Sequence, residues 1–161
     1  TNILDGISNS SQMVDEYRLD WVSAHSYKKH SLATRINMGL FEAEENMLPL
    51  DPYELGGFLN LSGLPRNSLI GQNKLFGSLV YRYRWFDNDF GMFQSPIYIG
   101  ASAEYGGLWS DVDLGIKEAP MFAAGSIFTG IDSPIGPVTF AYGVTEDNMS
   151  SVYLIIGNAF K

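Results

Sequence analysis

The feature that most constrains this chain is an alternation of apolar and polar side chains with a period of two. In residues 12–24, apolar residues occupy odd positions, whereas Glu16, Arg18 and Asp20 occupy even ones. Successive side chains of a β-strand point to opposite faces, so this period predicts strands with one apolar and one polar face. Its recurrence predicts an all-β antiparallel fold. The predicted strands are residues 12–24, 31–41, 74–85, 97–109, 121–131, 138–144 and 152–160.

The connections between these strands differ in length. Pro134-Ile135-Gly136-Pro137 is a short turn, whereas residues 42–52 and 86–96 are acidic or aromatic and are predicted to be loops. Short turns at one end and long loops at the other are typical of a membrane β-barrel. Residues 53–61 form either an eighth strand or a loop segment.

Composition excludes several classes of protein. The 161 residues fit a single domain (1–161), and 45% hydrophobic with 17% charged residues is too apolar for disorder. No apolar run reaches the roughly 18 residues of a membrane-spanning helix. The formal net charge of -8 makes nucleic acid a poor partner, and the absence of cysteine excludes disulfides. Residues 1–10 lack the features of a signal peptide, so we expect any such segment to lie outside this sequence.

Aromatic residues distinguish a membrane barrel from a soluble one. They lie near strand ends on the apolar face, whereas strand centres carry Leu, Ile and Ala, as in the aromatic girdles of barrels in lipid. We therefore predict an antiparallel transmembrane β-barrel of about eight strands in the bacterial outer membrane, with lipid as a partner. A soluble sandwich or lipid-binding β-barrel is the alternative from another class. The aromatic residues concerned are Trp21, Tyr83, Trp85, Tyr105 and Trp109.

Charged residues of both signs share the polar faces of the predicted strands. If the apolar faces meet lipid, these charges face the barrel lumen, where a narrow barrel can bury them only as pairs. They either line a conduit or plug contact, or neutralise one another inside a closed barrel, since side chains fill the interior at about eight strands. The predicted lumenal charges are Glu16, Arg18, Asp20, Arg35, Lys74, Arg82, Arg84 and Glu104.

We find no set of residues suited to catalysis, a cofactor or a metal ion. The nearest approach to a nucleophile elbow, Gly100-Ala-Ser102-Ala-Glu104, lies in mid-strand and lacks the second glycine. His25 and His30 flank a turn and are too few for a metal site. The acidic pairs Asp87/Asp89 and Asp111/Asp113 lack the spacing of a calcium loop. The chain is predicted not to be an enzyme.

Four segments in order resemble a known family. They read LGGFLNLSGLPRNSLIGQNKLFGSLVYRYRW, PIYIGASAEYGGLW, AAGSIFTGIDSPIGPVTFAYG and SSVYLIIGNAF. These segments resemble the C-terminal half of the surface-antigen barrel fused to bacterial patatin-like phospholipases, within the outer-membrane assembly and two-partner secretion superfamily. The resemblance covers residues 53–160.

The resemblance implies a loop folded into the barrel lumen. The family motif is Val-Arg-Gly-Tyr or Leu-Ser-Gly-Tyr, so Ser62 stands where the superfamily has arginine and Leu64 where it has tyrosine. Paired glycines let such a loop lie close to the barrel wall, and Asn60 and Ser62 can bond to it. A glycine-rich β-turn is the alternative. The implied loop residues are Gly56, Gly57, Asn60, Leu61, Ser62 and Gly63.

The resemblance also implies a role. It predicts a translocator barrel of the type V secretion kind that anchors, displays or exports a passenger domain; a small structural or pore-forming barrel is the alternative. The penultimate Phe160 would be the signal read by the barrel assembly machinery. The family barrel has sixteen strands, so this chain is a fragment, a self-closed eight-stranded barrel, or a half barrel completed by a second copy as a homodimer, because an isolated half barrel leaves an open edge in lipid.

Overall fold

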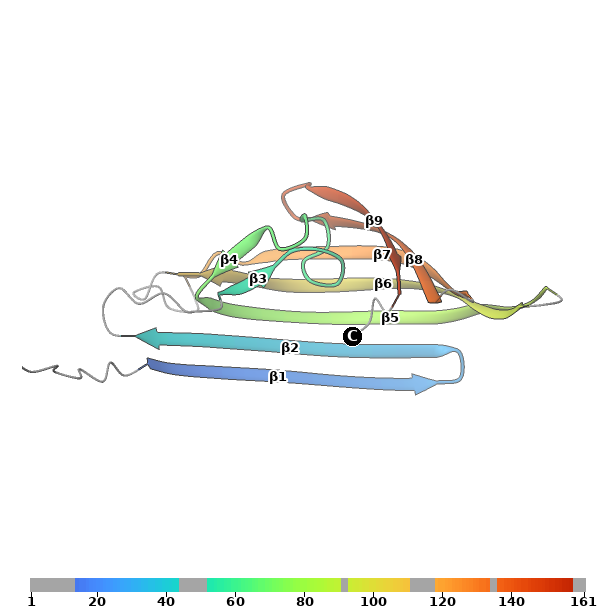
Figure 1. Ribbon diagram of the computed structural model, residues 1–161, viewed down its shortest axis with the longest axis horizontal. Coiled ribbons are helices and arrows are strands. Elements are labelled where there is room, and N and C mark those ends of the chain that lie inside the picture. The colour runs from blue at the N-terminus through green and yellow to red at the C-terminus, as the bar shows by residue number, and fades with distance from the viewer. Residues whose placement is uncertain (1–13, 44–51, 91–92, 111–117, 134–135, 158–161) are drawn as a thin grey trace, which may run out of the picture.

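A computed structural model describes residues 14–43, 52–90, 93–110, 118–133 and 136–157. Every regular element in them is a β-strand, and the strands pair antiparallel (Figure 1). The predicted all-β antiparallel fold is confirmed. The strands are β1 (Val14–Tyr27), β2 (His30–Ala43), β3 (Tyr53–Leu55), β4 (Leu69–Gly71), β5 (Asn73–Phe90), β6 (Phe93–Trp109), β7 (Phe122–Ser133), β8 (Gly136–Thr145) and β9 (Ser150–Ile156).

Seven of these strands form one sheet in the order β1-β2-β5-β6-β7-β8-β9, and β3 pairs with β4. Each strand of the large sheet pairs with its nearest neighbour in sequence once the β3–β4 insertion is set aside. Strands β1 and β9 lie at the two ends of the order. In the described part of the chain the sheet is therefore open, and closure of a barrel of about eight strands is not seen there.

The register gives the large sheet one apolar face, which we call the outer face. Side chains on one face lie opposite one another across paired strands. One such row crosses six strands, and its end members are Leu32 on β2 and Val152 on β9. The row reads Leu32, Tyr81, Ala101, Ile127, Tyr142 and Val152.

The outer face is exposed in every strand of the large sheet. The two-residue period thus leaves exposed apolar side chains on this face of each of the seven strands, although Trp109 at the end of β6 is buried. The exposed large apolar side chains on it are Tyr17, Leu19, Trp21, Tyr27, Leu32, Ile36, Leu79, Tyr81, Trp85, Ile99, Tyr105, Ile127, Phe140, Tyr142, Val144, Val152, Leu154 and Ile156.

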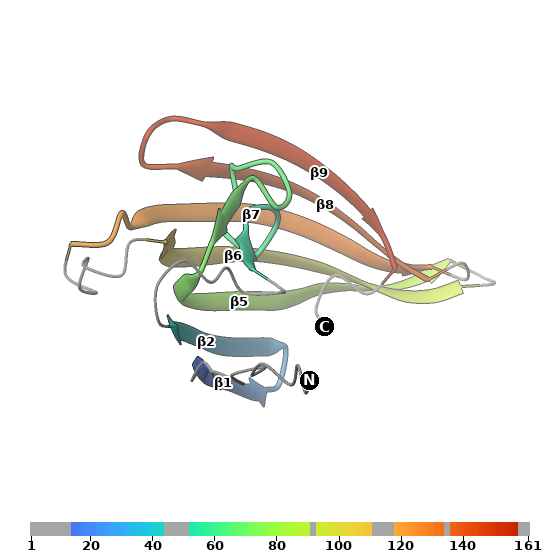
Figure 2. The ribbon, with the colours of Figure 1, turned by 60° about the vertical axis from the view of Figure 1, so that its left-hand side comes forward.

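The opposite face, the inner face, is partly covered by the chain itself. Residues 56–68, which we call the inner loop, connect β3 to β4 and lie against the sheet (Figure 2). Two small cores form between the loop and the sheet. The buried members are Leu55, Leu61, Leu64, Phe76 and Leu108 in one and Leu59, Val80, Phe128 and Ala141 in the other.

Two expectations from the sequence need correction, and the structure also decides between the two alternatives for residues 53–61. The predicted loop at residues 86–96 is wrong, because β5 continues to Phe90, β6 begins at Phe93, and the two strands pair along this stretch. The register shifts between Arg84 and Phe86, so a bulge interrupts the alternation there. Trp109 is only 6% exposed and so does not belong to the exposed aromatic residues. Residues 53–61 contribute only the three-residue strand β3 and the start of the inner loop.

No helix capable of spanning a bilayer occurs among the residues described.

Candidate functional site

The inner loop is compact because its backbone takes conformations that extended strands do not. Gly56 and Gly57 have φ angles of 120° and 109°, which a side chain would disfavour. The Gly56 N–H donates to the Asn60 carbonyl oxygen at 2.8 Å, and the Asn60 N–H donates to the Gly57 carbonyl at 3.0 Å. These bonds reverse the chain immediately after β3. The loop therefore folds back over the sheet rather than extending from its edge.

Two leucines of the inner loop also have left-handed backbones. Leu59 has a φ of 58° and Leu61 a φ of 71°, a region that a bulky L-residue rarely adopts. Both side chains are buried. Since the strained conformation places them in the two cores, burial of their side chains offsets its cost.

Glu104 on β6 is the main polar contact of the inner loop. Its carboxylate accepts the Ser62 N–H at 2.7 Å and the Ser62 hydroxyl at 2.8 Å. The Ser102 hydroxyl also donates to it, and Ser126 bonds to Ser102 at 2.7 Å. Glu104 is 3% exposed, so a carboxylate here requires these donors to replace water. The arrangement holds the loop through one buried carboxylate.

Strand β9 provides a second polar contact. The Tyr153 hydroxyl accepts the Gly63 N–H at 2.9 Å and donates to the Leu64 carbonyl at 2.8 Å. The Ser151 hydroxyl donates to the Gly63 carbonyl at 2.9 Å. One tyrosine and one serine thereby satisfy the backbone groups of three successive peptide units that would otherwise be buried without partners.

Strand β8 approaches the inner loop too closely for a side chain. A Cβ added to Gly143 would lie 2.6 Å from both the Gly63 nitrogen and the Ser62 Cβ. Gly63 itself has a φ of 104°, and its own Cβ would lie 2.8 Å from the Thr145 nitrogen. Glycine is therefore required at both positions for the loop to contact the sheet.

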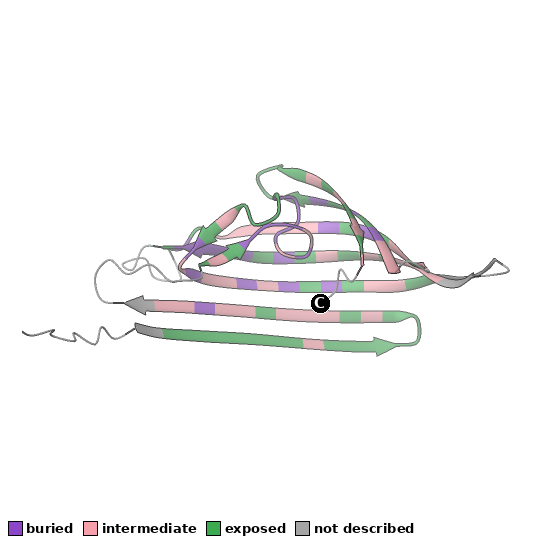
Figure 3. Ribbon diagram, in the orientation of Figure 1, coloured by how far each residue is buried: buried purple, intermediate pink, exposed green. Residues whose placement is uncertain are grey.

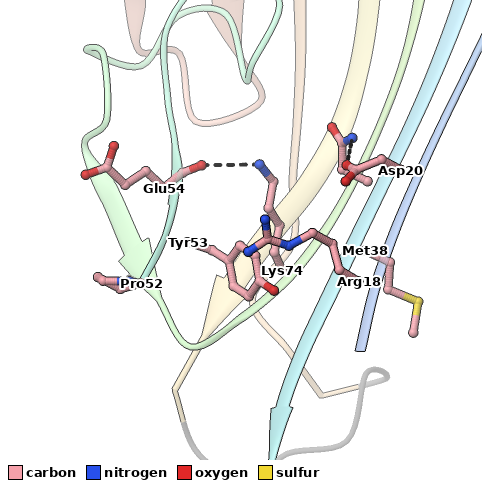
Figure 4. A pocket seen from close by; sticks show the side chains of 8 residues that line it. Arg18, Asp20, Met38, Pro52, Tyr53, Glu54 and Lys74 are labelled. Atoms are coloured by element: carbon pink, nitrogen blue, oxygen red, sulfur yellow. Dashed lines mark hydrogen bonds between the residues drawn. The ribbon is translucent and has the colours of Figure 1, made fainter. Parts of the chain in front are cut away.

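A polar cavity of about 330 Å³ lies where the β3–β4 hairpin meets β1, β2 and β5 (Figure 4). The Tyr53 hydroxyl donates to Glu16 at 2.8 Å, and Arg18 forms an ion pair with the same carboxylate at 2.9 Å. Lys74 donates to the Glu54 carbonyl at 3.4 Å (Figure 4). Burial and the bond to Glu16 raise the pKa of Tyr53. The cavity holds both signs of charge.

The structure places all eight predicted lumenal charges on the inner face, but it does not bury them. Glu104 alone among the eight is buried, and the others are exposed or half-buried. The pairing expected of these charges inside a closed barrel stays a prediction, because the described sheet is open. Arg18 pairs with Glu16 of its own strand, and Asn37 donates across strands to Asp20 at 2.6 Å.

The predicted loop residues divide into two groups. Ser62 and Gly63 contact the sheet directly, and Leu61 is fully buried in one core. Gly56, Gly57 and Asn60 instead shape the turn after β3.

Sequence reasoning named both Ser62 and Glu104 but did not connect them. It missed Tyr153, Ser151 and Ser126 altogether, and it considered Ser102 only as a nucleophile and not as a partner of Glu104. The sequence indicated them only through their positions. Each carries a hydroxyl group and lies at a position of the two-residue alternation that faces the inner side of the sheet.

The structure shows the contacts of several other residues that the sequence analysis considered. Ser102 bonds to Glu104 and Ser126 within the sheet, with no histidine among its partners. His30 bonds to the Tyr81 hydroxyl at 2.6 Å and His25 to Ser23 at 3.3 Å. Among the described residues no three histidine or acidic side chains lie close enough to hold a metal ion. Phe160 and the side chains of Asp87, Asp89, Asp111 and Asp113 lie outside the described part.

No family model matches the chain, and no curated protein matches it either. The described residues form an antiparallel sheet with an exposed apolar outer face and a loop packed on the polar inner face.

Proposed function

We propose that this chain forms part of an outer-membrane β-barrel that anchors, displays or exports a passenger polypeptide. The observation that carries the proposal is the exposed apolar outer face, which extends over all seven strands of the large sheet. Apolar surface of this extent is costly in water and marks a contact with a membrane or another protein. Polar and charged side chains lie on the opposite face, as in the lumen of a membrane barrel.

If the sheet lies in lipid, as proposed, its two end strands need further partners. Strands β1 and β9 each pair with a single neighbour in the described residues, so each leaves backbone donors and acceptors along its other edge. Unpaired backbone groups in lipid cost several kcal/mol each. Within the proposal, further strands of a longer chain, pairing of the two ends, or a second copy supplies the missing partners.

The position of the inner loop favours the role of an anchor and argues against an open pore. It lies on the inner face, bonded to β6 through Glu104 and to β9 through Tyr153. A segment held in this way occupies space that a conduit would need. Absence of stable unitary ion conductance in liposomes is therefore expected, and its presence would favour the small pore-forming barrel.

Paired arginine substitutions test the membrane assignment. Ile127 is 65% exposed on the outer face and Val22 is 63% exposed on the inner face. Arginine at a lipid-facing position costs about 2–4 kcal/mol near the bilayer midplane. We expect Ile127→Arg to reduce the folded amount in the outer-membrane fraction and Val22→Arg to leave it unchanged. Folded protein should migrate differently from boiled protein on cold SDS gels.

The opposite result identifies the rival class. If the chain is soluble without detergent and tolerates both arginine substitutions equally, a soluble lipid-binding β-barrel replaces the outer-membrane proposal.

The passenger role comes from the resemblance of residues 53–160 to the surface-antigen barrel of patatin-like phospholipases. Fusion of a soluble reporter domain ahead of Thr1 tests it. An anchor keeps the reporter in the outer-membrane fraction, and an exporter makes it sensitive to protease added outside cells. A reporter that remains in the periplasm as soluble protein contradicts both roles.

A further inference from the structure

A cavity at the turn between β1 and β2 gathers positive charge in a chain that is otherwise acidic. Its volume is about 290 Å³. Four of the ten Lys and Arg residues of the chain line it, although the net charge of the whole chain is -8. The lining residues are Ser26, Lys28, Lys29, Ser31, Arg82, Arg84 and Tyr98.

The strand register brings these residues together. Ser31 on β2 lies opposite both Ser26 on β1 and Arg82 on β5, and the two serine hydroxyls are 2.9 Å apart. Arg84 lies opposite Tyr98 on β6. All five share the inner face, because residues paired across strands point the same way. The site is therefore built by four strands of the sheet.

The turn adds the two lysines. Lys28 has a φ of 54°, which closes the hairpin in two residues, and the Arg84 N–H donates to the Lys29 carbonyl at 2.8 Å. This bond ties the turn to β5 and holds Lys28 and Lys29 beside Arg84. Lys28 also lies over the Tyr27 ring, with its nitrogen 5.3 Å from the ring centroid.

The Tyr98 hydroxyl donates to Asp132 on β7 at 3.5 Å, so a described carboxylate also borders this group. Lysine and arginine side chains are donors only, and the serine hydroxyls can donate as well. Arginine presents a planar fork that matches an anion with several oxygens.

We propose that this cavity, which we call the cationic cavity, binds a phosphate group. Phosphate offers three acceptor oxygens and close to two negative charges, which suits a group of donors better than a single carboxylate does. The cavity is far larger than the ~30 Å³ share of one water, so it admits a phosphate with an organic substituent. The source is either a free phosphate compound or a lipid headgroup.

Aromatic residues on the outer face near the cationic cavity favour a lipid headgroup as the source of the phosphate. Tyr27, Tyr81 and Trp85 are exposed there, on the same strands that line the cavity. Aromatic side chains of membrane barrels lie at headgroup level, where lipid phosphates are. The lipid source rests on the proposed function, whereas the free-phosphate source does not.

Calorimetric titration with inorganic phosphate tests the site. The full chain is refolded in a non-ionic detergent without phosphate, at ionic strength fixed with chloride. We expect saturable binding. Lys28→Gln/Lys29→Gln should weaken it about tenfold, and Arg82→Gln/Arg84→Gln about tenfold or more, since each pair removes charge-assisted hydrogen bonds. Arg66→Gln/Lys74→Gln removes the same charge outside the cavity and should change affinity less than twofold.

Folding of each variant is checked by its heat-dependent gel mobility. If the Arg82/Arg84 variant does not fold, the lysine pair decides alone, because both lysines are exposed in the turn. Equal weakening by the control pair would mean that phosphate responds to overall charge, which overturns the site.

Mixed micelles distinguish the two sources. Binding of inorganic phosphate, lost in the cavity variants, supports a free phosphate compound. Binding of phosphatidylglycerol and phosphatidylcholine without binding of inorganic phosphate supports a lipid headgroup. Binding of neither, or tighter binding of an acidic peptide than of any phosphate, overturns the proposal. Each result is read in detergent on folded protein, so it is independent of where the barrel resides.

Discussion

The two ends of the sheet differ in what covers their inner face. On β5 to β9 the inner loop packs against the strands, and the buried residues of these strands lie on β5 to β8 (Figure 3). On β1 the described side chains are almost all exposed, and β2 has few buried positions (Figure 3). The same alternating sequence pattern thus produces a packed region and an open one. The difference comes from the inserted segment together with the strand residues that contact it, such as Glu104, Gly143 and Tyr153.

Different interactions stabilise the packed region and the open region. In the packed region the inner loop buries leucines and satisfies its own backbone through Glu104 and Tyr153. In the open region β1 is held by its pairing with β2 and by exposed polar contacts. Removal of loop contacts should therefore destabilise the protein far more than removal of contacts on β1.

The largest effect is expected from Leu61→Ala. Leu61 is fully buried at 0% exposure, and truncation of a buried leucine leaves a cavity that costs about 2–5 kcal/mol. Urea unfolding in non-ionic detergent measures the loss. Ile70→Ala is the control, because Ile70 lies on β4 and is 64% exposed, so its loss should stay below about 0.5 kcal/mol. Equal losses would mean that the inner loop does not form a core.

Glu104→Gln should have the next largest effect. The amide presents a donor to Ser62 and Ser102, which already donate, and it removes the charge that strengthens both bonds. We expect a loss of about 1.5–3 kcal/mol in the free energy of unfolding, together with faster trypsin cleavage after Arg66 in the inner loop. Glu54→Gln, at an exposed position of β3, should change neither measurement. Unchanged trypsin cleavage in the Glu104 variant would show that the loop is held by its leucines alone.

The strands could be predicted because their signal is local. Alternation over ten or more residues fixes the phase of each strand, and the seven predicted strands correspond to β1, β2 and β5 to β9. The failure at residues 86–96 has a physical cause. The bulge after Arg84 breaks the two-residue period, and Asp87, Asn88 and Asp89 have low β propensity, so a paired stretch resembled a loop.

The contacts of the inner loop could not be predicted from the sequence. Leucine has no intrinsic preference for the left-handed backbone found at Leu59 and Leu61. The surrounding packing selects this conformation, so the sequence does not predict it. The bonds from Ser62 to Glu104 and from Tyr153 to Gly63 join residues 42 and 90 positions apart. Composition and period indicated which face these residues occupy, but not which of them meet.

A smaller effect is expected from Tyr153→Phe. The substitution keeps the ring and removes the hydroxyl that bonds to the Gly63 N–H and the Leu64 carbonyl. Loss of such neutral bonds costs about 0.5–1.5 kcal/mol. Tyr142→Phe, on the exposed outer face of β8, is the matched control and should lose less than about 0.5 kcal/mol. If the two variants unfold at the same urea concentration, the hydroxyl of Tyr153 adds nothing to attachment of the loop.

The smallest effect on stability is expected from Glu16→Gln, a substitution on β1 in the open region. Glu16 accepts bonds from Tyr53 and Arg18, as Glu104 does from Ser62 and Ser102, yet its surroundings are solvent. Water and salt screen an exposed ion pair, and free side chains regain rotamer entropy when it breaks. The midpoint of thermal unfolding should therefore be the same for Glu16→Gln and the wild type, at low and at high salt. A loss that matches Tyr153→Phe and disappears at high salt would instead mean that Glu16 fastens β1 to the β3–β4 hairpin, and the open region would then be held in the same way as the packed one.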